Sequence, residues 1–341
     1  MTHPTSTDTE RTQRPRGPGV PRTVALVGAR GHVGAELLTL LAEHPELSVV
    51  LAASREHAGV HVGDVLPHVD LDLSFESLDH HELAKYAARV VAIDAWLLAL
   101  PNGLARPWVK AIHAIHPGAV IVDLSTDHRF DREWVYGLPE IHRSRLLRAR
   151  KIANPGCYAT GAQLGLFPVL AHLEGAAHIF GVSGYSGAGT TPSPRNDPQV
   201  LADNLLPYAL TGHSHEQEIR WQLGHKAFFT PHVAPFFRGI TLTISFLLRR
   251  PLSSDELAQR YLDAYQHEPL IRVTRDIPLV RDAADRHEVH IGGFAVEPET
   301  AHAVIVVTLD NLLKGAATQA IQNLNLALGM DELAGLRHHL A

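Results

Sequence analysis

Short apolar runs alternate with helical periodicity along the first half of the chain. Residues 23–28 (TVALVG) are apolar and β-branched, which is typical of a buried strand. Residues 31–43 follow with apolar side chains at helical spacing, including Val33, Leu37 and Leu41. Strands are also predicted at residues 48–53, 90–93 with 96–100, and 119–124, and a helix at residues 108–115. Strands that alternate with helices predict a parallel sheet with right-handed crossovers.

The periodicity changes after about residue 156. Residues 240–248 (ITLTISFLL) form a long alternating pattern, which is typical of a strand with one buried face. Further strands are predicted at residues 179–183, 289–296 and 303–309, and helices at 159–170, 254–265 and 315–328. Long strands separated by helices favour an α+β arrangement on a mostly antiparallel sheet. We expect the last helix to pack back on the first half of the chain.

Composition narrows the function classes. The 30 Lys and Arg against 36 Asp and Glu give a net charge of −6, which argues against a general nucleic-acid binder. The single cysteine excludes an intrachain disulfide and a cysteine-based zinc cage. No apolar run reaches the roughly 18 residues that a membrane-spanning helix needs, so no membrane association is expected. Residues 1–22 lack an apolar segment, so we expect a flexible tail and a cytoplasmic protein.

A glycine-rich turn follows the first predicted strand. Residues 28–34 (GARGHVG) read G-x-x-G-x-x-G with glycines at Gly28, Gly31 and Gly34. Such a turn lets the backbone approach a pyrophosphate, which the free N–H groups of the next helix can bind. A glycine turn without a ligand is the alternative. The strand–turn–helix context favours a Rossmann-type dinucleotide-binding domain, with candidate contacts from Arg30, His32 and Val33.

The end of the second strand indicates which dinucleotide binds. An NAD enzyme usually has an acidic residue there for the ribose 2′-OH, whereas this chain has Ser54 and Arg55. A guanidinium binds phosphate through paired charged hydrogen bonds, so this position favours NADP over a merely solvated arginine. Pro101 and Ser125 follow later strands and are expected at the same edge of the sheet.

Cys157 has a neighbourhood that can activate it. It follows Asn154, Pro155 and Gly156 and precedes a predicted helix. Near a helix N-terminus the dipole favours a thiolate, which is the nucleophilic form of cysteine. A buried, inert cysteine is the alternative reading, because that is the usual environment of a lone cysteine.

A second segment offers acid–base groups. His213, His215 and Glu218 form an H-x-H-x-x-E pattern, in which an imidazole can transfer protons and the carboxylate can orient it. Two histidines with a glutamate also suit a metal, but nothing nearby completes a zinc site, so no metal is predicted. The glycine-rich residues 183–189 can bring N–H groups to an anion, and Arg238 can hold a carboxylate or phosphate.

Taken together, these motifs resemble the N-acetyl-gamma-glutamyl-phosphate reductases, relatives of aspartate-semialdehyde dehydrogenase. The similarity extends from Val24 to about Gly329, and order and spacing agree. The matching segments are GARGHVG at 28–34, DLSTDHR at 123–129, YGLPE at 136–140, NPGCYAT at 154–160, SGYSGAG at 183–189, HSHEQEI at 213–219, PHVAPFFRGI at 231–240 and DNLLKGAATQAIQNLN at 310–325.

The resemblance implies roles for individual residues. Cys157 would be the nucleophile and His213 the acid–base residue, although whether His213 or His215 carries the proton stays open. Substrate contacts would come from His215, Glu218, Arg238, Tyr208 and Ser183, and further NADP contacts from Gly187 and Asn311. The chain departs from the family pattern at Ser214 and Gln217, and it has Thr190 and Thr191 where a basic residue is common. Phosphate is therefore expected to be held differently.

The implied activity is NADPH-dependent reduction of N-acetyl-gamma-glutamyl phosphate to N-acetylglutamate semialdehyde and phosphate, through a thioester on Cys157, in arginine biosynthesis. The implied assembly is a homodimer or homotetramer, joined by the sheet of the second domain. We expect a tail at residues 1–22, an NADP-binding domain at 23–156 with 312–341, and a catalytic and dimerisation domain at 157–311. The alternatives are a reductase of aspartyl or carrier-linked aminoadipyl phosphate, and an NADP-sensing protein without catalysis.

Overall fold

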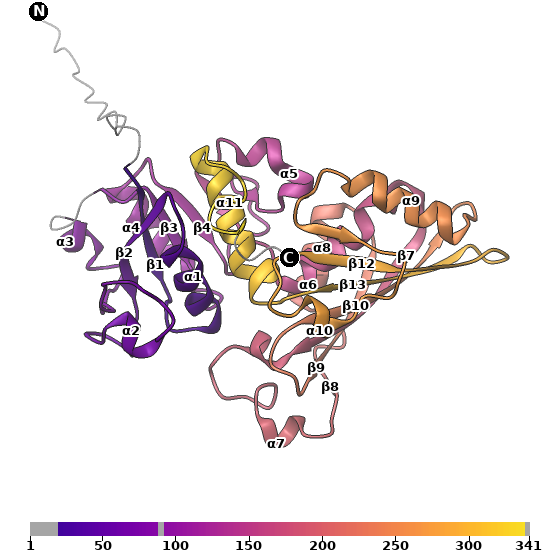
Figure 1. The fold of residues 1–341 in the computed structure, drawn as a ribbon, viewed down its shortest axis with the longest axis horizontal. Coiled ribbons are helices and arrows are strands. Elements are labelled where there is room, and N and C mark those ends of the chain that lie inside the picture. The colour runs from indigo at the N-terminus through magenta and orange to yellow at the C-terminus, as the bar shows by residue number, and fades with distance from the viewer. Residues whose placement is uncertain (1–19, 88–91, 338–341) are drawn as a thin grey trace, which may run out of the picture.

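A parallel sheet and a mixed sheet organise the chain (Figure 1). The computed structural model describes residues 20–87 and 92–337. Most of the expected N-terminal tail and the start of the strand expected at 90–93 lie outside the described residues. Within the described part, no helix has both the length and the apolar character needed to cross a membrane.

The first sheet has six strands, and every pairing in it is parallel. Its spatial order is β2 (Leu47–Ala53), β1 (Arg22–Val27), β3 (Ala95–Leu98), β4 (Val120–Asp123), β6 (Lys151–Ala153) and β5 (Val135–Tyr136). The predicted parallel sheet is confirmed. The two short strands β5 and β6 were not predicted, because two or three residues are too few to show a period.

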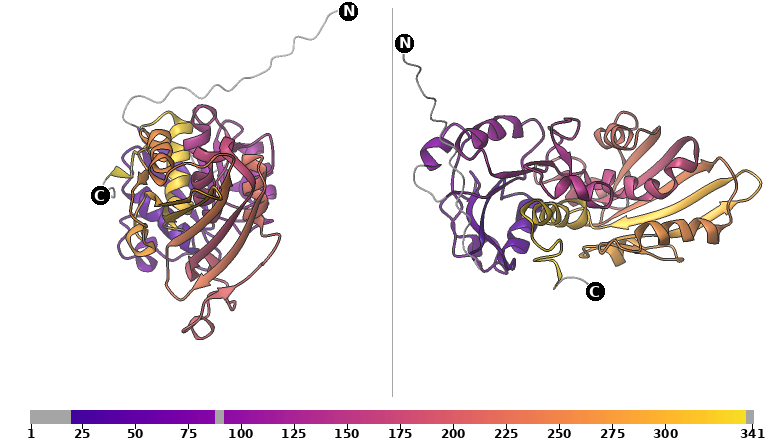
Figure 2. Two further views of the ribbon diagram at one scale, coloured as in Figure 1. Left: turned by 90° about the vertical axis from the view of Figure 1, so that its right-hand side faces the viewer. Right: turned by 90° about the horizontal axis from the view of Figure 1, so that it is seen from above.

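Both faces of this sheet are covered, as its apolar sequence requires. Val24 and Leu26 of β1 face the helices α1 (His32–Ala42) and α11 (Thr318–Leu328). Ala25 and Val27 face the opposite side, where they meet α3 (Leu83–Ala87) and α4 (Ala105–Ile115). The last helix therefore returns to the first sheet, as the sequence predicted, and lies beside it in both views of Figure 2.

The second sheet has seven strands, and four of its six pairings are antiparallel. Its order is β11 (Ile271–Val273), β12 (Val289–Glu297), β13 (His302–Leu309), β10 (Ile240–Leu248), β7 (Leu173–Gly184), β9 (Ala227–Ala234) and β8 (Leu206–Pro207). The predicted mostly antiparallel sheet is confirmed, with β7–β9 and β11–β12 as its parallel pairs.

Helices cover one face of the second sheet. Leu242 and Ile244 of β10 are fully buried beneath α6 (Cys157–Leu166), and α9 (Ser254–Tyr265) packs on the same core. The other face carries the exposed side chains Phe180, Phe228 and Leu247. Such a row of exposed apolar residues on a sheet is typical of a contact surface.

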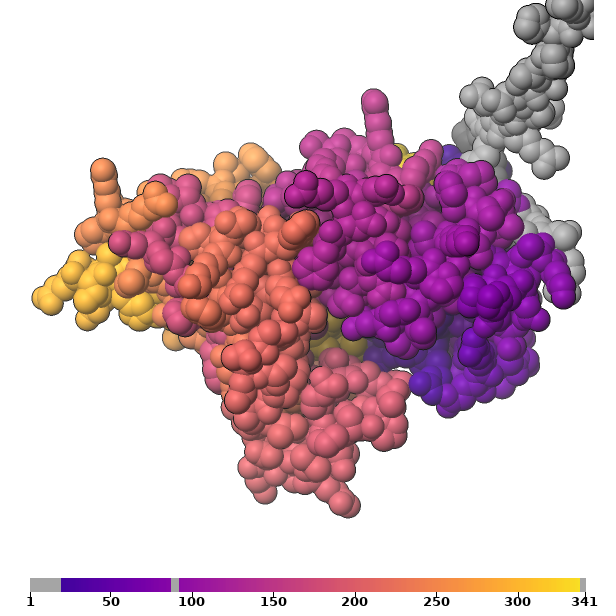
Figure 3. All heavy atoms as spheres, turned by 180° about the vertical axis from the view of Figure 1, so that it is seen from behind, coloured from indigo at the N-terminus to yellow at the C-terminus, as the bar shows by residue number. Residues whose placement is uncertain are grey.

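Several short elements lie between the strands of the two sheets. A segment that includes α7 projects from the body of the molecule, as Figure 3 shows from behind. The remaining elements are α2 (Val62–Val65), α5 (Pro139–Leu146), α7 (Pro198–Leu201), α8 (Ser214–Leu223), α10 (Val280–Ala283), the 3₁₀ helices η1 (Phe167–His172) and η2 (Tyr185–Ala188), and the π-helix η3 (Leu313–Ala317).

A buried ion pair holds η3 in place at the start of the returning helix. Lys314 donates to Glu140 of α5 at 2.7 Å, and both side chains are fully buried. Lys314 also donates to Gln322 of α11. A buried charge is tolerated only with such partners, so the pair fixes how η3 and α11 follow the second sheet.

Replacing Lys314 with Met should lower the free energy of unfolding by about 3–5 kcal/mol, because Glu140 would remain as a buried, unpaired charge. The measurement is equilibrium denaturation in urea. Lys151→Met is the matched control: Lys151 pairs with Glu133 at 3.3 Å on the surface, and its loss should cost less than about 1 kcal/mol. Equal losses for the two variants would contradict the assignment. Adding Glu140→Leu to Lys314→Met should recover much of the stability.

Candidate active site

Cys157 begins α6 at the junction of the two sheets. The chain leaves β6 at Ala153 and turns through Pro155, and Gly156 precedes the helix without a side-chain cap. The backbone N–H groups of Cys157 and Tyr158 are directed at the sulfur. Cys157 opens into a cavity of about 230 Å³. That cavity is also lined by Val33, Ala99, Leu100, Leu124, Arg129, Asn154, Pro155, Gly156, Ser186, Gly187, His215, Asn311, Leu312, Gly315 and Ala316.

Glu218 lies beneath the Cys157 turn and is buried, with 1% of its side chain exposed. Its Oε1 accepts the Gly156 N–H at 2.9 Å and the Tyr136 hydroxyl at 2.6 Å. Its Oε2 accepts Arg129 Nη1 at 3.0 Å. Arg129 is itself buried and donates to the carbonyls of Asn154 and Leu124. Both oxygens of Glu218 are therefore engaged by protein groups, which suits a positioning residue.

His215 projects from the first turn of α8 into the Cys157 cavity. A Cβ added to Gly156 would lie 2.2 Å from His215 Nε2, so only glycine lets this imidazole approach the cysteine turn so closely. The Nδ1 atom is buried and has no hydrogen-bond partner among the described residues. Burial, aided by the charge of Arg129, holds the pKa of His215 well below its usual range. The imidazole is therefore neutral and able to accept a proton.

His213 has a different position. Its Nδ1 accepts the backbone N–H of His215 at 3.1 Å, so it caps α8, and it does not line the Cys157 cavity. Burial, with a smaller effect from the charge of Arg195, lowers the pKa of His213 to about 4. The imidazoles of His213 and His215 are 4.8 Å apart between centroids. Of the two histidines, geometry thus brings His215 to the cysteine.

The cysteine is protonated at neutral pH in this setting. Burial raises the pKa of the Cys157 thiol to about 11, and this outweighs the nearby N–H groups and the charge of Arg129, which lower it. A neutral thiol beside a neutral imidazole is suited to proton transfer as the sulfur attacks. A cysteine in this setting needs a base to remove its proton before it can act as a nucleophile.

The opposite wall of the cavity comes from the start of the returning segment. A Cβ added to Gly315 would lie 2.7 Å from Cys157 Cβ, so η3 passes directly over the cysteine. Asn311 lines the same cavity, where its Oδ1 accepts the Gly239 N–H and its Nδ2 donates to Ser186 Oγ. Gly187 follows in that turn. The predicted residues Gly187 and Asn311 thus lie beside Cys157.

A second cavity, of about 360 Å³, lies at the glycine-rich turn of the first sheet. Gly28 has φ +88°, and a Cβ there would meet the Ala99 carbonyl oxygen at 2.2 Å, so the turn requires glycine. The predicted residues Gly28, Arg30, Ser54, Arg55 and Pro101 line this cavity together with apolar Val27, Leu78, Leu100, Leu104 and Trp108. Apolar walls suit an adenine ring and the arginines suit phosphate, so these residues fit a dinucleotide.

The remaining residues of the glycine-rich motif have separate places. Gly31 precedes α1 without a side-chain cap, which leaves N–H groups of the first turn open to an anion. Gly34 lies inside α1, where a Cβ would meet the Gly28 oxygen at 2.6 Å. Val33 lines the Cys157 cavity, and His32 lines another opening beside Phe237. The Cys157 cavity and the cavity at the glycine-rich turn therefore meet at the N-terminus of α1.

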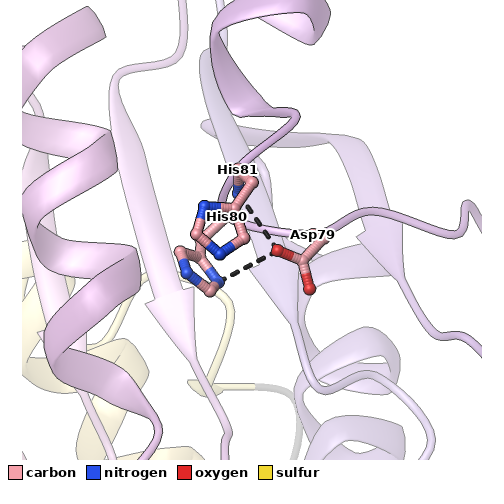
Figure 4. A group of neighbouring side chains, drawn as sticks. All are labelled: Asp79, His80 and His81. Atoms are coloured by element: carbon pink, nitrogen blue, oxygen red, sulfur yellow. Dashed lines mark hydrogen bonds and ion pairs between the residues drawn. The ribbon is translucent and has the colours of Figure 1, made fainter.

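Both arginines of the dinucleotide cavity already have acidic partners. Arg30 pairs with Glu56 and donates to Thr190 of the second half of the chain at 3.1 Å. Arg55 pairs with Asp79 at 2.6 Å. Figure 4 shows Asp79 with His80 and His81, whose ligand atoms lie within 4.8 Å of one another. A cation at this group would face the positive charge of Arg55, so we assign no metal to it.

Like His213 and Glu218, the predicted residues Arg238, Ser125, Ser183 and Tyr208 do not line the Cys157 cavity. Arg238 forms ion pairs with Asp310, Asp285 and Glu36 at 2.5–2.9 Å, so its guanidinium is occupied and does not face the cysteine. Ser125 is buried and its hydroxyl donates to Asp123. Ser183 is buried and donates to the Gly184 carbonyl, and Tyr208 lies next to His213 at 5.5 Å between centroids. The sequence indicated no contact partners for these side chains.

The structure adds residues that the sequence did not single out. Arg129 and Tyr136 lie in segments that carry the resemblance, yet only the fold shows that both bind Glu218. Asn154 accepts from Asn323 of α11 at 3.0 Å and donates to the Ala316 carbonyl. The available signal was that all three residues lie in the segments that carry the resemblance, at 123–129, 136–140 and 154–160.

Comparison with known proteins gives the same two parts. The sequence profile of the semialdehyde dehydrogenase NAD binding domain matches residues 23–149, and that of the semialdehyde dehydrogenase dimerisation domain matches residues 157–311. Aspartate semialdehyde dehydrogenase II of Vibrio cholerae, in complex with ASA, superposes with a TM-score of 0.71 over 91% of this chain and 98% of that one, at 21% identity. This likeness shows the fold.

Curated relatives match at much higher identity. N-acetyl-gamma-glutamyl-phosphate reductase of Xanthomonas campestris pv. campestris (strain B100) is 54% identical over 93% of this chain and 98% of its own length. The protein of that name from Stenotrophomonas maltophilia (strain R551-3) is 52% identical over the same shares. Protein arg11, mitochondrial, of Schizosaccharomyces pombe is 48% identical over 97% of this chain and 37% of its own length. The chain therefore belongs to the N-acetyl-gamma-glutamyl-phosphate reductase family.

Proposed function

We propose that the protein reduces N-acetyl-gamma-glutamyl phosphate with NADPH to N-acetylglutamate semialdehyde and phosphate, as a step of arginine biosynthesis. The observation that carries this proposal is one cavity that Cys157 shares with His215 and with Val33 of the glycine-rich turn. A nucleophile, a neutral base and a dinucleotide site around one space suit acyl transfer followed by hydride transfer.

In the first half-reaction His215 accepts the proton of the Cys157 thiol as the sulfur attacks the acyl carbon. Phosphate leaves with the electron pair of the broken C–O bond, and a thioester on Cys157 remains. The low pKa of the buried imidazole and the raised pKa of the buried thiol keep both groups neutral before substrate arrives. The N–H groups at the start of α6 can stabilise the oxyanion of the tetrahedral intermediate.

In the second half-reaction the thioester carbon is reduced. The bound NADPH supplies the hydride for this step. His215, protonated in the first half-reaction, returns its proton as the C–S bond breaks, and the aldehyde leaves. Glu218 and Arg129 hold the Gly156 turn throughout, so that sulfur and imidazole keep their relative positions.

We infer that NADP is bound in preference to NAD. Ser54 and Arg55 stand at the end of β2, where an acidic residue would otherwise bind the ribose 2′-OH. Arg30 lines the same cavity and supplies a second guanidinium. Two cations suit the 2′-phosphate, because a guanidinium binds phosphate through paired charged hydrogen bonds. Their pairs with Glu56 and Asp79 are exposed to solvent, so a phosphate can replace these carboxylates more easily than it could those of the less exposed Arg238.

We also propose a function for each domain and a contact surface for oligomerisation. Residues 23–156 with 312–341 would bind NADP, and residues 157–311 would carry catalysis and dimerisation. The exposed face of the second sheet, with Phe180, Phe228 and Leu247, would join protomers of a homodimer or homotetramer in the cytoplasm. An apolar row on an open sheet face is the feature that supports this contact surface.

Replacing Cys157 with Ser should abolish turnover while NADP affinity stays within about threefold, because a serine hydroxyl is a far weaker nucleophile than a cysteine sulfur. The assay is NADP reduction with N-acetylglutamate semialdehyde and phosphate, with NADP binding measured by fluorescence. Turnover at the unsubstituted rate would rule out the thioester. Activity with aspartate semialdehyde but none with the N-acetylated substrate would favour an aspartyl-phosphate reductase, and NADP binding without turnover of any semialdehyde would favour a sensor.

Replacing His215 with Asn should lower kcat by about 10²–10⁴. Since the thiol has a pKa of about 11, the residual rate should rise about tenfold per pH unit below about pH 10, because thiolate must then form without the base. His213→Asn is the matched comparison, since Asn also caps a helix, and it should cost less than about tenfold. A larger loss for His213→Asn than for His215→Asn would assign the proton to His213.

Replacing Arg55 with Ala should raise KM for NADP by about tenfold or more and leave KM for NAD within about twofold, because only NADP carries the 2′-phosphate. Initial rates with each coenzyme measure both values. Arg337→Ala is the control, because Arg337 forms a similar exposed pair with Asp331 away from the dinucleotide cavity. Equal changes in both coenzyme KM values would remove Arg55 from phosphate recognition.

A further inference from the structure

The proposed substrate carries two anionic groups, and they lie at opposite ends. Phosphate leaves from the side-chain carbon that Cys157 attacks, whereas the carboxylate is bonded to the α-carbon at the other end of the substrate. The cations nearest the cysteine cannot serve the far end, because Arg129 is paired with Glu218 and Lys314 with Glu140. Arg238 is held by three carboxylates.

Arg195 differs from these cations. It is exposed, and no carboxylate of the described residues forms an ion pair with it within 4.0 Å. Its guanidinium carbon lies 5.1 Å from the centroid of the Tyr208 ring. Arg195 also hydrogen-bonds the Tyr208 hydroxyl. A guanidinium has five N–H donors, so donors remain at its edge where an anion can bind.

Hydrogen bonds hold the loop that carries Arg195 in a defined conformation. Asn196 donates to the carbonyls of Gly189 and Thr191, both at 2.8 Å, and accepts the Ser193 N–H at 2.8 Å. Asp197 then caps α7 by accepting the Gln199 N–H. These bonds fix the loop directly after the turn that lines the Cys157 cavity.

A series of neighbouring aromatic rings connects Arg195 to the Cys157 cavity. Tyr208 lies 5.5 Å from His213, and His213 lies 4.8 Å from His215, between ring centroids. The charge of Arg195 also affects one of these rings, because it lowers the pKa of His213. Arg195 thus stands at the outer end of the site, with the reacting sulfur at the inner end.

Resting on the function proposed above, we propose that Arg195 binds the distal carboxylate of the acyl substrate and so selects acyl phosphates that carry such a carboxylate over those that lack it. Arg195 does not line the Cys157 cavity, whereas the phosphate is bonded to the carbon that Cys157 attacks, so Arg195 is assigned to the other anion. Tyr208, over whose ring Arg195 lies, is near enough to Cys157 for the thiol to affect the pKa of Tyr208. Two N–H groups of a guanidinium match the two oxygens of a carboxylate.

The first test is a binding experiment that needs no turnover. N-acetylglutamine keeps the distal carboxylate but has an unreactive amide, and N-acetylglutamine amide lacks the charge. Calorimetry on the full chain should show that the unsubstituted protein prefers the charged probe. Arg195→Gln should bind it about tenfold more weakly and no better than the neutral probe, and Arg195→Lys should recover part of the affinity.

Arg132→Gln is the matched control, because Arg132 is also exposed over an aromatic ring, that of Trp221 at 5.7 Å, away from the Cys157 cavity. It should bind both probes as the unsubstituted protein does. Equal affinity of Arg195→Gln and the unsubstituted protein for N-acetylglutamine would overturn the proposal, as would a failure of the unsubstituted protein to prefer the charged probe.

In the reverse reaction the carboxylate belongs to N-acetylglutamate semialdehyde and phosphate is a separate substrate. The second test therefore measures KM for each of the two anions separately. Arg195→Gln should raise KM for N-acetylglutamate semialdehyde about tenfold and leave KM for phosphate within about twofold. A rise in the phosphate KM alone would place Arg195 at the phosphate and refute the carboxylate assignment. A chain that binds the charged probe through Arg195 yet turns over no semialdehyde would instead refute the proposed function.

Discussion

The active site depends on the buried carboxylate of Glu218. It accepts the Gly156 N–H, the Tyr136 hydroxyl and the Arg129 guanidinium, and it belongs to the same helix as His215. One side chain thus fixes the start of the cysteine helix against the helix that carries the base. A buried carboxylate is stable only with such a full set of partners, so the network leaves little freedom in the position of the sulfur.

Burial also decides how the site is charged. The same walls that exclude water raise the pKa of Cys157 to about 11 and hold that of His215 well below its usual range. The two shifts have opposite directions, because desolvation favours the neutral form of both an acid and a base. The outcome is that the thiol and the imidazole are both uncharged before a substrate binds.

Polar contacts near the dinucleotide cavity tie the two halves of the chain together. Arg238 of the second half pairs with Glu36 of α1, and Arg30 of the glycine-rich turn donates to Thr190. Arg238 is therefore a structural link, which explains why it does not reach toward the cysteine. The same contacts hold the glycine-rich turn and the half of the chain that carries Cys157 in a fixed relative position.

The sequence by itself determined the two sheets, the glycine turn at Gly28 and the cysteine at a helix start, because periodicity, turn chemistry and caps act over a few neighbouring residues. Motif order also identified the family. Tertiary structure decided which histidine meets Cys157, that Arg238 is occupied, and that Arg195 forms no ion pair with a carboxylate of the described residues. These facts depend on contacts between residues far apart in the chain, and local spacing holds no information about which partners long-range packing will supply.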